Sequence, residues 1–273
     1  MIEGIVRPAR RPRGWLAPGP APQTPSRVDV WPREGEDLCY LAGDWRILQK
    51  TRGHRFSLDD VVTAHFATRF ARPERLLDLG CGIGSVLLFL AWRFPGARCL
   101  GVEAQPVSAE MARRSVAWNG VEDRVEVRPG DFREVGLDEQ FDLITGTPPY
   151  FPRGTGVESE SVQKGPCRFE HRGGVDDYCL KAAPLLKPGA PFVGCAPSWQ
   201  RERVLEAARA AGLSVERWRD VIPRAGKAPL VSVFSMKREA VEMVVEPPLV
   251  VRDERSRRTE EFVHLRAEMG MPP

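Results

Sequence analysis

Arg75-Leu76-Leu77-Asp78-Leu79-Gly80-Cys81-Gly82-Ile83-Gly84 is the stretch of this 273-residue chain that decides its fold. Its first half predicts a buried strand, and its glycines predict a tight turn into a helix over residues 85–94. Further strands are expected at 97–102, 125–127, 141–145 and 192–196, and helices at 107–118, 174–186 and 200–211. Strands that alternate with helices indicate a Rossmann-like α/β fold whose mostly parallel sheet is covered on both faces.

Two last strands, predicted at 215–221 and 229–236, follow one another without a helix between them. A connection too short for a crossover joins antiparallel neighbours. These strands therefore predict an antiparallel hairpin at one edge and bring the expected sheet to seven strands.

The first 27 residues differ in composition from the rest of the chain. They carry five arginines and six prolines against a single acid, Glu3. Such a segment buries too little apolar surface to offset the entropy of ordering it, so we expect residues 1–28 to be a disordered basic arm. The arm is either a solvated tail or a weak electrostatic hook for phosphates.

The remaining chain divides into three parts. Residues 29–73 are expected to form a cap segment with a helix over 57–70, and residues 74–240 the central domain. Residues 241–273 are expected to form a tail that packs on this domain.

The composition excludes several classes of protein. A net charge of +3 does not by itself point to nucleic acid. The six cysteines form no C-x-x-C pair and the four histidines share no close spacing with them, so we expect no disulfide framework, no metal site and a reducing cytoplasm. The chain also lacks the apolar core of a secretory signal and any run near the ~20 apolar residues of a membrane span.

The loop at residues 80–84 follows the first strand, and ligands of open α/β sheets bind beyond such strand ends. The dinucleotide fingerprint G-x-G-x-x-G would place its last glycine at Ser85, whereas here the third glycine comes one residue earlier. An acid, Asp78, stands two residues before the first glycine. This pattern favours S-adenosylmethionine, which has no pyrophosphate to seat on a helix N-terminus.

Two further strand ends carry acids. Glu103 ends the second strand, where a carboxylate can accept both ribose hydroxyls, and Asp131 and Phe132 after the third strand fit an adenine amine and an adenine face. A glycine turn or a terminal acid is common alone, so the prediction depends on three acids at three successive strand ends. The predicted cofactor site comprises Asp78, Gly80, Cys81, Gly82, Gly84, Glu103, Ala104, Asp131 and Phe132.

Thr147-Pro148-Pro149-Tyr150 follows the fourth strand and is the predicted catalytic motif. A conjugated amine is a poor nucleophile because its lone pair is delocalised, so a catalyst must accept hydrogen bonds from its N–H groups and align it. The Pro148 carbonyl and the Thr147 hydroxyl are the candidate acceptors, on a backbone that two prolines stiffen. Tyr150 would stack on a planar base. The alternative is a proline-rich turn that only closes a strand.

With these motifs in this order, the chain resembles the bacterial tRNA (adenine-N6)-methyltransferases that modify the adenine beside the anticodon of valine tRNA. The resemblance runs from about residue 39 to residue 269 and includes residues 56–60, 78–84, 101–103, 130–131, 148–151, 246–251 and 259–261. It implies a class I methyltransferase fold with a seven-stranded sheet, S-adenosylmethionine as cofactor and a structured RNA, in particular tRNA, as substrate. It also implies that the glycine loop, Glu103 and Asp131 bind the cofactor.

Two departures from the family pattern lie at the predicted reacting site. Thr147 stands where the family usually has Asn, so an acceptor is kept but its reach is shorter. Arg168-Phe169-Glu170 stands where the family tends to have Arg-His-Glu. This triplet belongs to a long charged loop, 152–172, which we interpret as a substrate lid or a disordered insertion. The predicted substrate-binding residues are Phe151, Arg168, Glu170 and Lys227.

Three hypotheses for function remain open at this point. The favoured one is methyl transfer to the N6 amine of an adenine in RNA. The second is methylation of a glutamine amide in a protein or of a small amine. The third is a binding protein that keeps the cofactor fold but has lost turnover through Thr147. A monomer is expected.

Overall fold

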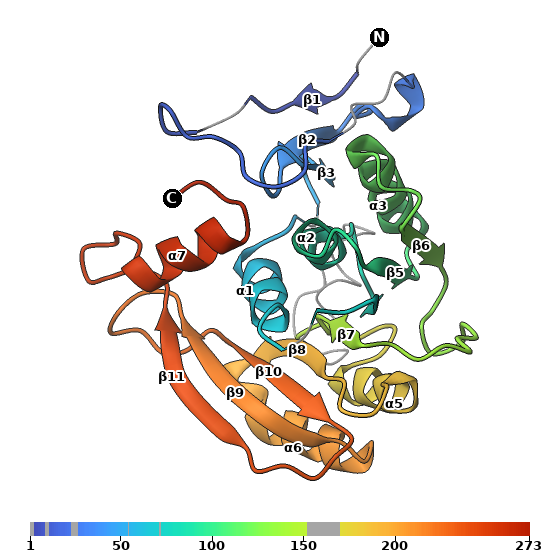
Figure 1. Ribbon diagram of the computed structural model, residues 1–273. Coiled ribbons are helices and arrows are strands. Elements are labelled where there is room, and N and C mark those ends of the chain that lie inside the picture. The colour runs from blue at the N-terminus through green and yellow to red at the C-terminus, as the bar shows by residue number, and fades with distance from the viewer. Residues whose placement is uncertain (1–2, 9–10, 23–26, 54, 71, 152–169) are drawn as a thin grey trace.

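The strand that precedes the glycine loop, β4 (Arg75–Leu79), lies inside an eight-stranded sheet of order β11-β9-β10-β8-β7-β4-β5-β6 (Figure 1). The structure is a computed structural model that describes residues 3–8, 11–22, 27–53, 55–70, 72–151 and 170–273. The other strands are β5 (Arg98–Glu103), β6 (Val125–Pro129), β7 (Leu143–Gly146), β8 (Phe192–Pro197), β9 (Ser214–Ile222), β10 (Val231–Lys237) and β11 (Val244–Val250).

Strand direction agrees with the sequence prediction. β4 to β8 run parallel to one another, whereas β10 runs antiparallel to both β8 and β9. The mostly parallel sheet with an antiparallel edge is therefore confirmed, and each of the seven expected strands is present. The carboxyl ends of β4, β5 and β7 meet at one edge of the sheet, because parallel strands end on the same side.

Helices cover both faces of the sheet. On one face, α1 (Leu58–Ala67), α2 (Ser85–Arg93) and α3 (Pro106–Asn119) pack in a cluster that includes the strand residues Leu76, Leu143 and Val193. On the other face, α5 (Val175–Leu185) and α6 (Arg201–Ala210) pack on adjacent residues of the same strands, Leu77, Ile144 and Phe192. Alternate residues thus face opposite layers, as the two-residue period of a strand requires.

The eighth strand, β11, is a difference from the seven-stranded expectation. It pairs parallel with β9 at the edge of the sheet, with a register shift between Glu246 and Leu249. The shift falls at Pro247 and Pro248, which lack the N–H groups that a regular ladder needs. Prolines in a run of mostly exposed residues hide the strand pattern, and only pairing with β9 makes it a strand.

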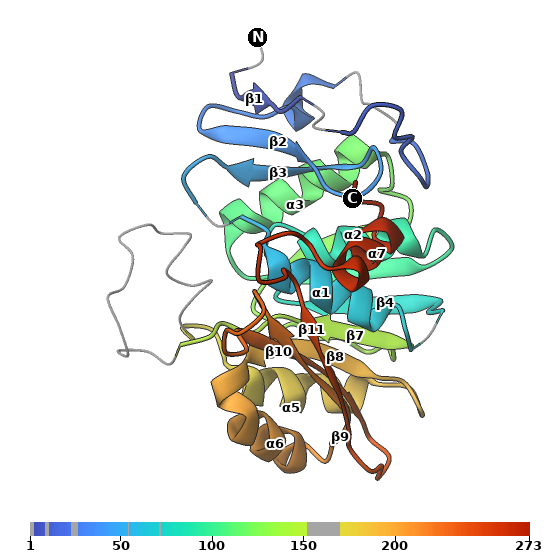
Figure 2. The same cartoon turned by 90° about the vertical axis from the view of Figure 1, so that its left-hand side faces the viewer.

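A second, three-stranded sheet is the other unpredicted element. It consists of β1 (Ile5–Val6), β2 (Glu36–Tyr40) and β3 (Arg46–Lys50), and it lies over α3 (Figure 2). The Leu48 N–H donates to the Ser115 hydroxyl of α3, and the Arg46 N–H donates to the Asn119 side chain. These polar contacts add to apolar packing, because Leu38, Ile47 and Leu48 of the sheet are buried in the same cluster as α3.

The described part of the N-terminal arm lies along this small sheet. Arg7 forms an ion pair with buried Asp37, and Arg11 forms one with Asp44 while its guanidinium stacks 4.4 Å from the Tyr40 ring centroid. Little of this segment's contact with the sheet is apolar. Ion pairs and cation–π contacts are a second means of holding such a segment.

Residues 241–273 supply β11 and a last helix, α7 (Glu260–Glu268). Phe262 and Leu265 of α7 are buried in the cluster on the α1 side. His65 of α1 also lies 2.7 Å from Glu268.

Candidate active site

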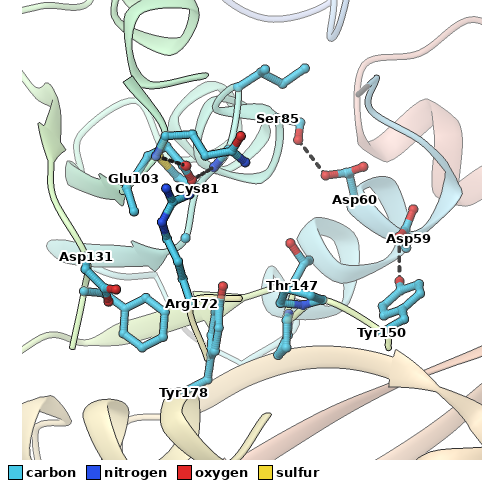
Figure 3. Close-up of a pocket in the computed structure, with 18 of the residues that line it drawn as sticks. Asp59, Asp60, Cys81, Ser85, Glu103, Asp131, Thr147, Tyr150, Arg172 and Tyr178 are labelled. Carbon is cyan, nitrogen blue, oxygen red and sulfur yellow. Dashed lines mark hydrogen bonds between the residues drawn. The ribbon is translucent and has the colours of Figure 1, made fainter. Parts of the chain in front are cut away.

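A cavity of about 260 Å³ opens at the carboxyl ends of β4, β5 and β7 (Figure 3). This is the edge at which ligands of open α/β sheets bind. Its wall comprises Asp59, Asp60, Gly80, Cys81, Gly82, Ile83, Ser85, Glu103, Ala104, Gln105, Asp131, Phe132, Thr147, Pro148, Pro149, Tyr150, Phe151, Arg172 and Tyr178. The structure therefore brings the glycine loop and the Thr-Pro-Pro-Tyr motif, far apart in sequence, to one cavity.

The glycines of the loop differ in what surrounds them. No residue that the structure describes has an atom within 4 Å of where a Cβ on Gly82, at φ +56°, would lie, so this backbone faces the open space of the cavity. A Cβ on Gly80, at φ +60°, would instead meet the hydroxyl of Tyr178 from α5. Gly84 begins α2, and a Cβ there would press on Ala112 of α3. Gly82 alone of these three leaves room for a ligand.

Glu103 ends β5 and is 93% buried at the cavity wall. One carboxylate oxygen accepts the Gly82 N–H at 2.9 Å, and the other accepts the Gln105 N–H at 2.6 Å. Two backbone bonds thus orient the carboxylate across the loop. A carboxylate held in this way at the end of a strand is a hydrogen-bond acceptor of the kind that suits ribose hydroxyls.

Asp131 and Phe132 follow β6, the strand next to β5, and line the same cavity as Glu103. Arg133 holds both Asp131 oxygens, at 3.0 and 2.6 Å, and lowers the pKa of that carboxyl. The Phe132 ring is buried, with its centroid 4.4 Å from that of Tyr178. A carboxylate and an aromatic face therefore lie side by side, a pair that suits a planar heterocycle with an amine.

The Thr-Pro-Pro-Tyr motif follows directly on the last residue of β7, and all four of its residues line the cavity. Thr147 is half-buried, and its hydroxyl makes no hydrogen bond to the part of the chain that the structure describes. It lies centrally among the labelled side chains of the wall (Figure 3). A hydroxyl so placed is available to a ligand as a hydrogen-bond acceptor.

The Tyr150 ring is held by α1. Its hydroxyl donates to Asp59 Oδ2 at 2.5 Å and lies 3.4 Å from the Cys195 sulfur. Burial, followed by the neighbouring Cys195 and Asp59, raises the pKa of Tyr150 well above its usual value. The residue is therefore a neutral donor with a fixed ring, and Asp59 is the part of the site that fixes it.

Two more carboxyls lie buried near the loop. Asp60 lines the cavity and accepts a hydrogen bond from the Ser85 hydroxyl at 2.6 Å, and burial followed by the Asp59 charge raises its pKa. Asp78 accepts one from the Thr145 hydroxyl at 2.8 Å, and burial raises its pKa to about 7. The end of the cavity nearest α1 and α2 is consequently acidic.

The sequence of this chain matches those of known methyltransferases. A methyltransferase domain model matches residues 76–152. A tRNA1(Val) (adenine(37)-N6)-methyltransferase of Bacteroides thetaiotaomicron is 30% identical over 201 residues, which cover 71% of this chain and 81% of that relative. This chain belongs to the tRNA1(Val) (adenine(37)-N6)-methyltransferase family.

Other relatives of the family match shorter parts. The protein of that name from Porphyromonas gingivalis is 34% identical over 121 residues, so the match spans 42% of this chain and about half, 47%, of the relative. A release factor glutamine methyltransferase of Geobacter sulfurreducens is 31% identical over 134 residues, 48% of this chain and 45% of that protein.

Solved structures show the same fold for this family member. The predicted O-methyltransferase Atu636 of Agrobacterium tumefaciens has a TM-score of 0.60 at 19% identity and covers 78% of this chain and 98% of its own. Precorrin-6y C5,15-methyltransferase of Geobacter metallireducens has a TM-score of 0.50 at 16% identity, with 71% and 93% covered. The class I methyltransferase fold is therefore confirmed. Among the described residues, no helix has the length and apolar character needed to cross a membrane.

Some predicted site residues of this family member lie elsewhere. Asp78 and Gly84 are outside the cavity wall, in the layers beneath it. Glu170 pairs with Arg203 at 2.5 Å, and its N–H donates to the Phe151 carbonyl. These contacts place Glu170 where it can anchor the end of the loop. Arg168, with the lid predicted around it, lies outside the described residues.

Lys227, also predicted to bind substrate, is exposed in the turn between β9 and β10 and is not in the cavity wall. Sequence reasoning missed other residues that do line it. Asp59 and Asp60 lie in the first turn of α1, where acids are common because they interact favourably with the helix dipole, so their residue type alone does not indicate the cavity. Arg172 belongs to the charged loop 152–172, and its charge alone does not indicate a place in the cavity wall. For Tyr178 the sequence offers one indirect sign, the glycine at position 80, which leaves room for the tyrosine hydroxyl.

Proposed function

We propose that this chain transfers the methyl group of S-adenosylmethionine to the N6 amine of an adenine in tRNA, with adenine 37 of tRNA1(Val) as the first candidate, in the cytoplasm. One observation carries the proposal: the glycine loop, Glu103 and the Thr-Pro-Pro-Tyr motif line a single cavity. The relatives named for that reaction support the choice of substrate.

The residues present fit the cofactor. Gly82 leaves room in the cavity wall, the Glu103 carboxylate at the end of β5 is an acceptor suited to ribose hydroxyls, and the Asp131 and Phe132 pair suits an adenine. When bound, S-adenosylmethionine supplies a methyl group on a positively charged sulfur. The acids of the cavity favour a cationic ligand of this kind.

The Thr147 hydroxyl and the Pro148 carbonyl would accept hydrogen bonds from the substrate amine. Accepting both N–H groups favours the tetrahedral form of nitrogen, in which the lone pair is localised and can attack. The prolines hold the acceptors in place, which lowers the entropy lost in alignment. After methylation the nitrogen releases a proton to water, so no side chain is needed as base.

Tyr150 would contact the extruded adenine from the side of α1. Its hydroxyl bond to Asp59 fixes the ring plane before substrate arrives. A base removed from its stack regains contact with this ring, which offsets part of the unstacking free energy.

The first test is methyl transfer from isotopically labelled S-adenosylmethionine to total RNA and, in parallel, to total protein from cells that lack this gene. We expect label in RNA, recovered as N6-methyladenosine. Label in neither pool would contradict the proposal. Thr147→Asn is the variant to compare with the parent protein. It introduces the longer side chain that the family usually has at this position, which also carries a hydrogen-bond acceptor, so activity on RNA should be preserved or raised.

A second candidate function is methylation of a glutamine amide in a protein. The observation that favours it is the match to the release factor glutamine methyltransferase. A primary amide, like N6 of adenine, is planar and delocalised, so the same acceptors would serve it. Label that appears only in protein would favour this function over the first.

A further inference from the structure

A solvent-exposed tryptophan stands beside the candidate active site. Trp199 lies in the short 3-10 turn η2 (Ser198–Gln200), which follows β8, and it is 68% exposed. Because β7 and β8 are parallel neighbours, η2 lies next to the motif that follows β7. The Trp199 ring centroid is 6.4 Å from that of Phe151, which lines the cavity.

The backbone on both sides of Trp199 is anchored. The Gln200 side chain donates to the Tyr150 carbonyl at 2.6 Å. The Ser198 N–H donates to the Leu230 carbonyl at 3.3 Å, and the Ser232 hydroxyl donates to that of Ser198 at 2.9 Å. The indole is therefore held outward by a fixed turn that is itself bonded to the catalytic motif.

The adjoining turn between β9 and β10 has the charge that a nucleic acid requires. Residues 223–230 contain Arg224 and Lys227 and no acid. Leu230, at the end of this turn, is exposed and lies beside Ser198 through the backbone bond described above. An exposed aromatic ring with cations beside it is the arrangement by which proteins hold single-stranded nucleic acid.

We propose that the Trp199 indole stacks on the base of a nucleotide adjacent to the methylated adenine in an RNA substrate. This inference rests on the proposed function. An adenine that enters the cavity leaves its stack, so the neighbouring base loses a partner. Trp199 replaces that partner, while Arg224 and Lys227 face the phosphates of the same strand.

The test compares Trp199→Ala and Trp199→Phe in the full chain, with a tRNA1(Val) transcript as substrate. Loss of one stacked base should raise KM about 5- to 150-fold in the alanine variant, equivalent to ~1–3 kcal/mol, and less in the phenylalanine variant. S-adenosylmethionine affinity and Tm should stay at the values of the parent protein. The control is Val245→Ala, since Val245 is 54% exposed on the remote edge strand β11 and should leave KM unchanged.

A second experiment asks whether the effect of Trp199→Ala depends on the base next to the target adenine. Two further transcripts carry an abasic site immediately 5′ or immediately 3′ of the target adenine. With one of them, the parent protein and Trp199→Ala should have the same KM, because the stacking partner is gone. Equal KM values on the intact transcript, or no coupling with either abasic transcript, would overturn the inference and leave the proposed function standing. A parent protein that methylates no RNA would overturn both.

Discussion

The Tyr150 hydroxyl donates a 2.5 Å hydrogen bond to Asp59, a residue 91 positions earlier in the chain. This bond joins α1, which precedes the sheet, to the motif that follows β7. Helix α1 is thus a wall of the candidate active site as well as a cover for the sheet. The orientation of Tyr150 depends on a carboxylate that lies outside both the glycine loop and the Thr-Pro-Pro-Tyr motif.

Asp59→Ala should lower kcat by about 10- to 100-fold, because a hydrogen bond to a charged group contributes ~1.5–3 kcal/mol and here it positions a ring at the reacting amine. S-adenosylmethionine affinity should change little. Asp59→Asn keeps an acceptor and serves as the control. The measurement is single-turnover methylation beside calorimetric binding, and equal losses in kcat and cofactor affinity would mean that Asp59 supports the whole cavity.

Glu103→Ala should weaken S-adenosylmethionine binding by ~1–3 kcal/mol, the usual effect of removing a partner from buried polar groups. Glu103→Gln keeps one acceptor oxygen and should lose less. Calorimetry measures the cofactor affinity of both variants. Unchanged affinity in the alanine variant would contradict the proposal that Glu103 binds the ribose hydroxyls of the cofactor. Tyr150→Ala is the complementary variant, with an expected loss of turnover much larger than its loss of cofactor affinity.

Gly80→Ala and Gly82→Ala form a matched pair, because both residues have φ near +60° and carry similar backbone strain. A Cβ at position 80 would clash with the Tyr178 hydroxyl, whereas one at position 82 meets open space. We expect Gly80→Ala to lower the free energy of unfolding by about 1–3 kcal/mol more than Gly82→Ala. Chemical denaturation tests this.

The same pair should show the reverse order in cofactor binding. A methyl group at position 82 would enter the cavity, so Gly82→Ala should weaken S-adenosylmethionine binding without a comparable loss of stability. Tyr178→Phe removes the clashing oxygen and should partly restore the stability of Gly80→Ala. If it restores nothing, Tyr178 is not what requires a glycine at position 80.

Stability should also depend on pH through Asp78. Burial raises its pKa from 3.8 to about 7, so the folded state favours the protonated carboxyl. The resulting stabilisation is fully present at pH values below 3.8, the pKa in the unfolded state, and is lost as pH rises through about 7, the pKa in the folded state. Relative to Asp78→Asn, the parent protein should lose at most about 1.4 kcal/mol per pH unit between roughly pH 4 and 7. A difference that stays constant across this range would show that Asp78 ionises normally.

Prediction from sequence succeeded where the signal is local. The run Leu76-Leu77 with its glycine turn predicts a strand, a turn and a helix from residues next to one another, and the seven expected strands are present. It was incomplete where an element depends on a distant partner. β11 contains two prolines and becomes a strand only by pairing with β9, and β3 both bonds to serine and asparagine side chains of α3 and packs Ile47 and Leu48 into the core beside it.

The candidate site likewise has features that local sequence predicts and features that depend on distant contacts. Periodicity and motif order were sufficient for the α/β sheet, for the edge at which a ligand binds, and for the family resemblance, because strand ends and the turns after them are set by neighbouring residues. Contacts at long range decided the rest. The opposite surroundings of Gly80 and Gly82, the Asp59 bond to Tyr150 and the exposure of Trp199 all arise when separate elements pack together, and no pattern within one segment encodes them.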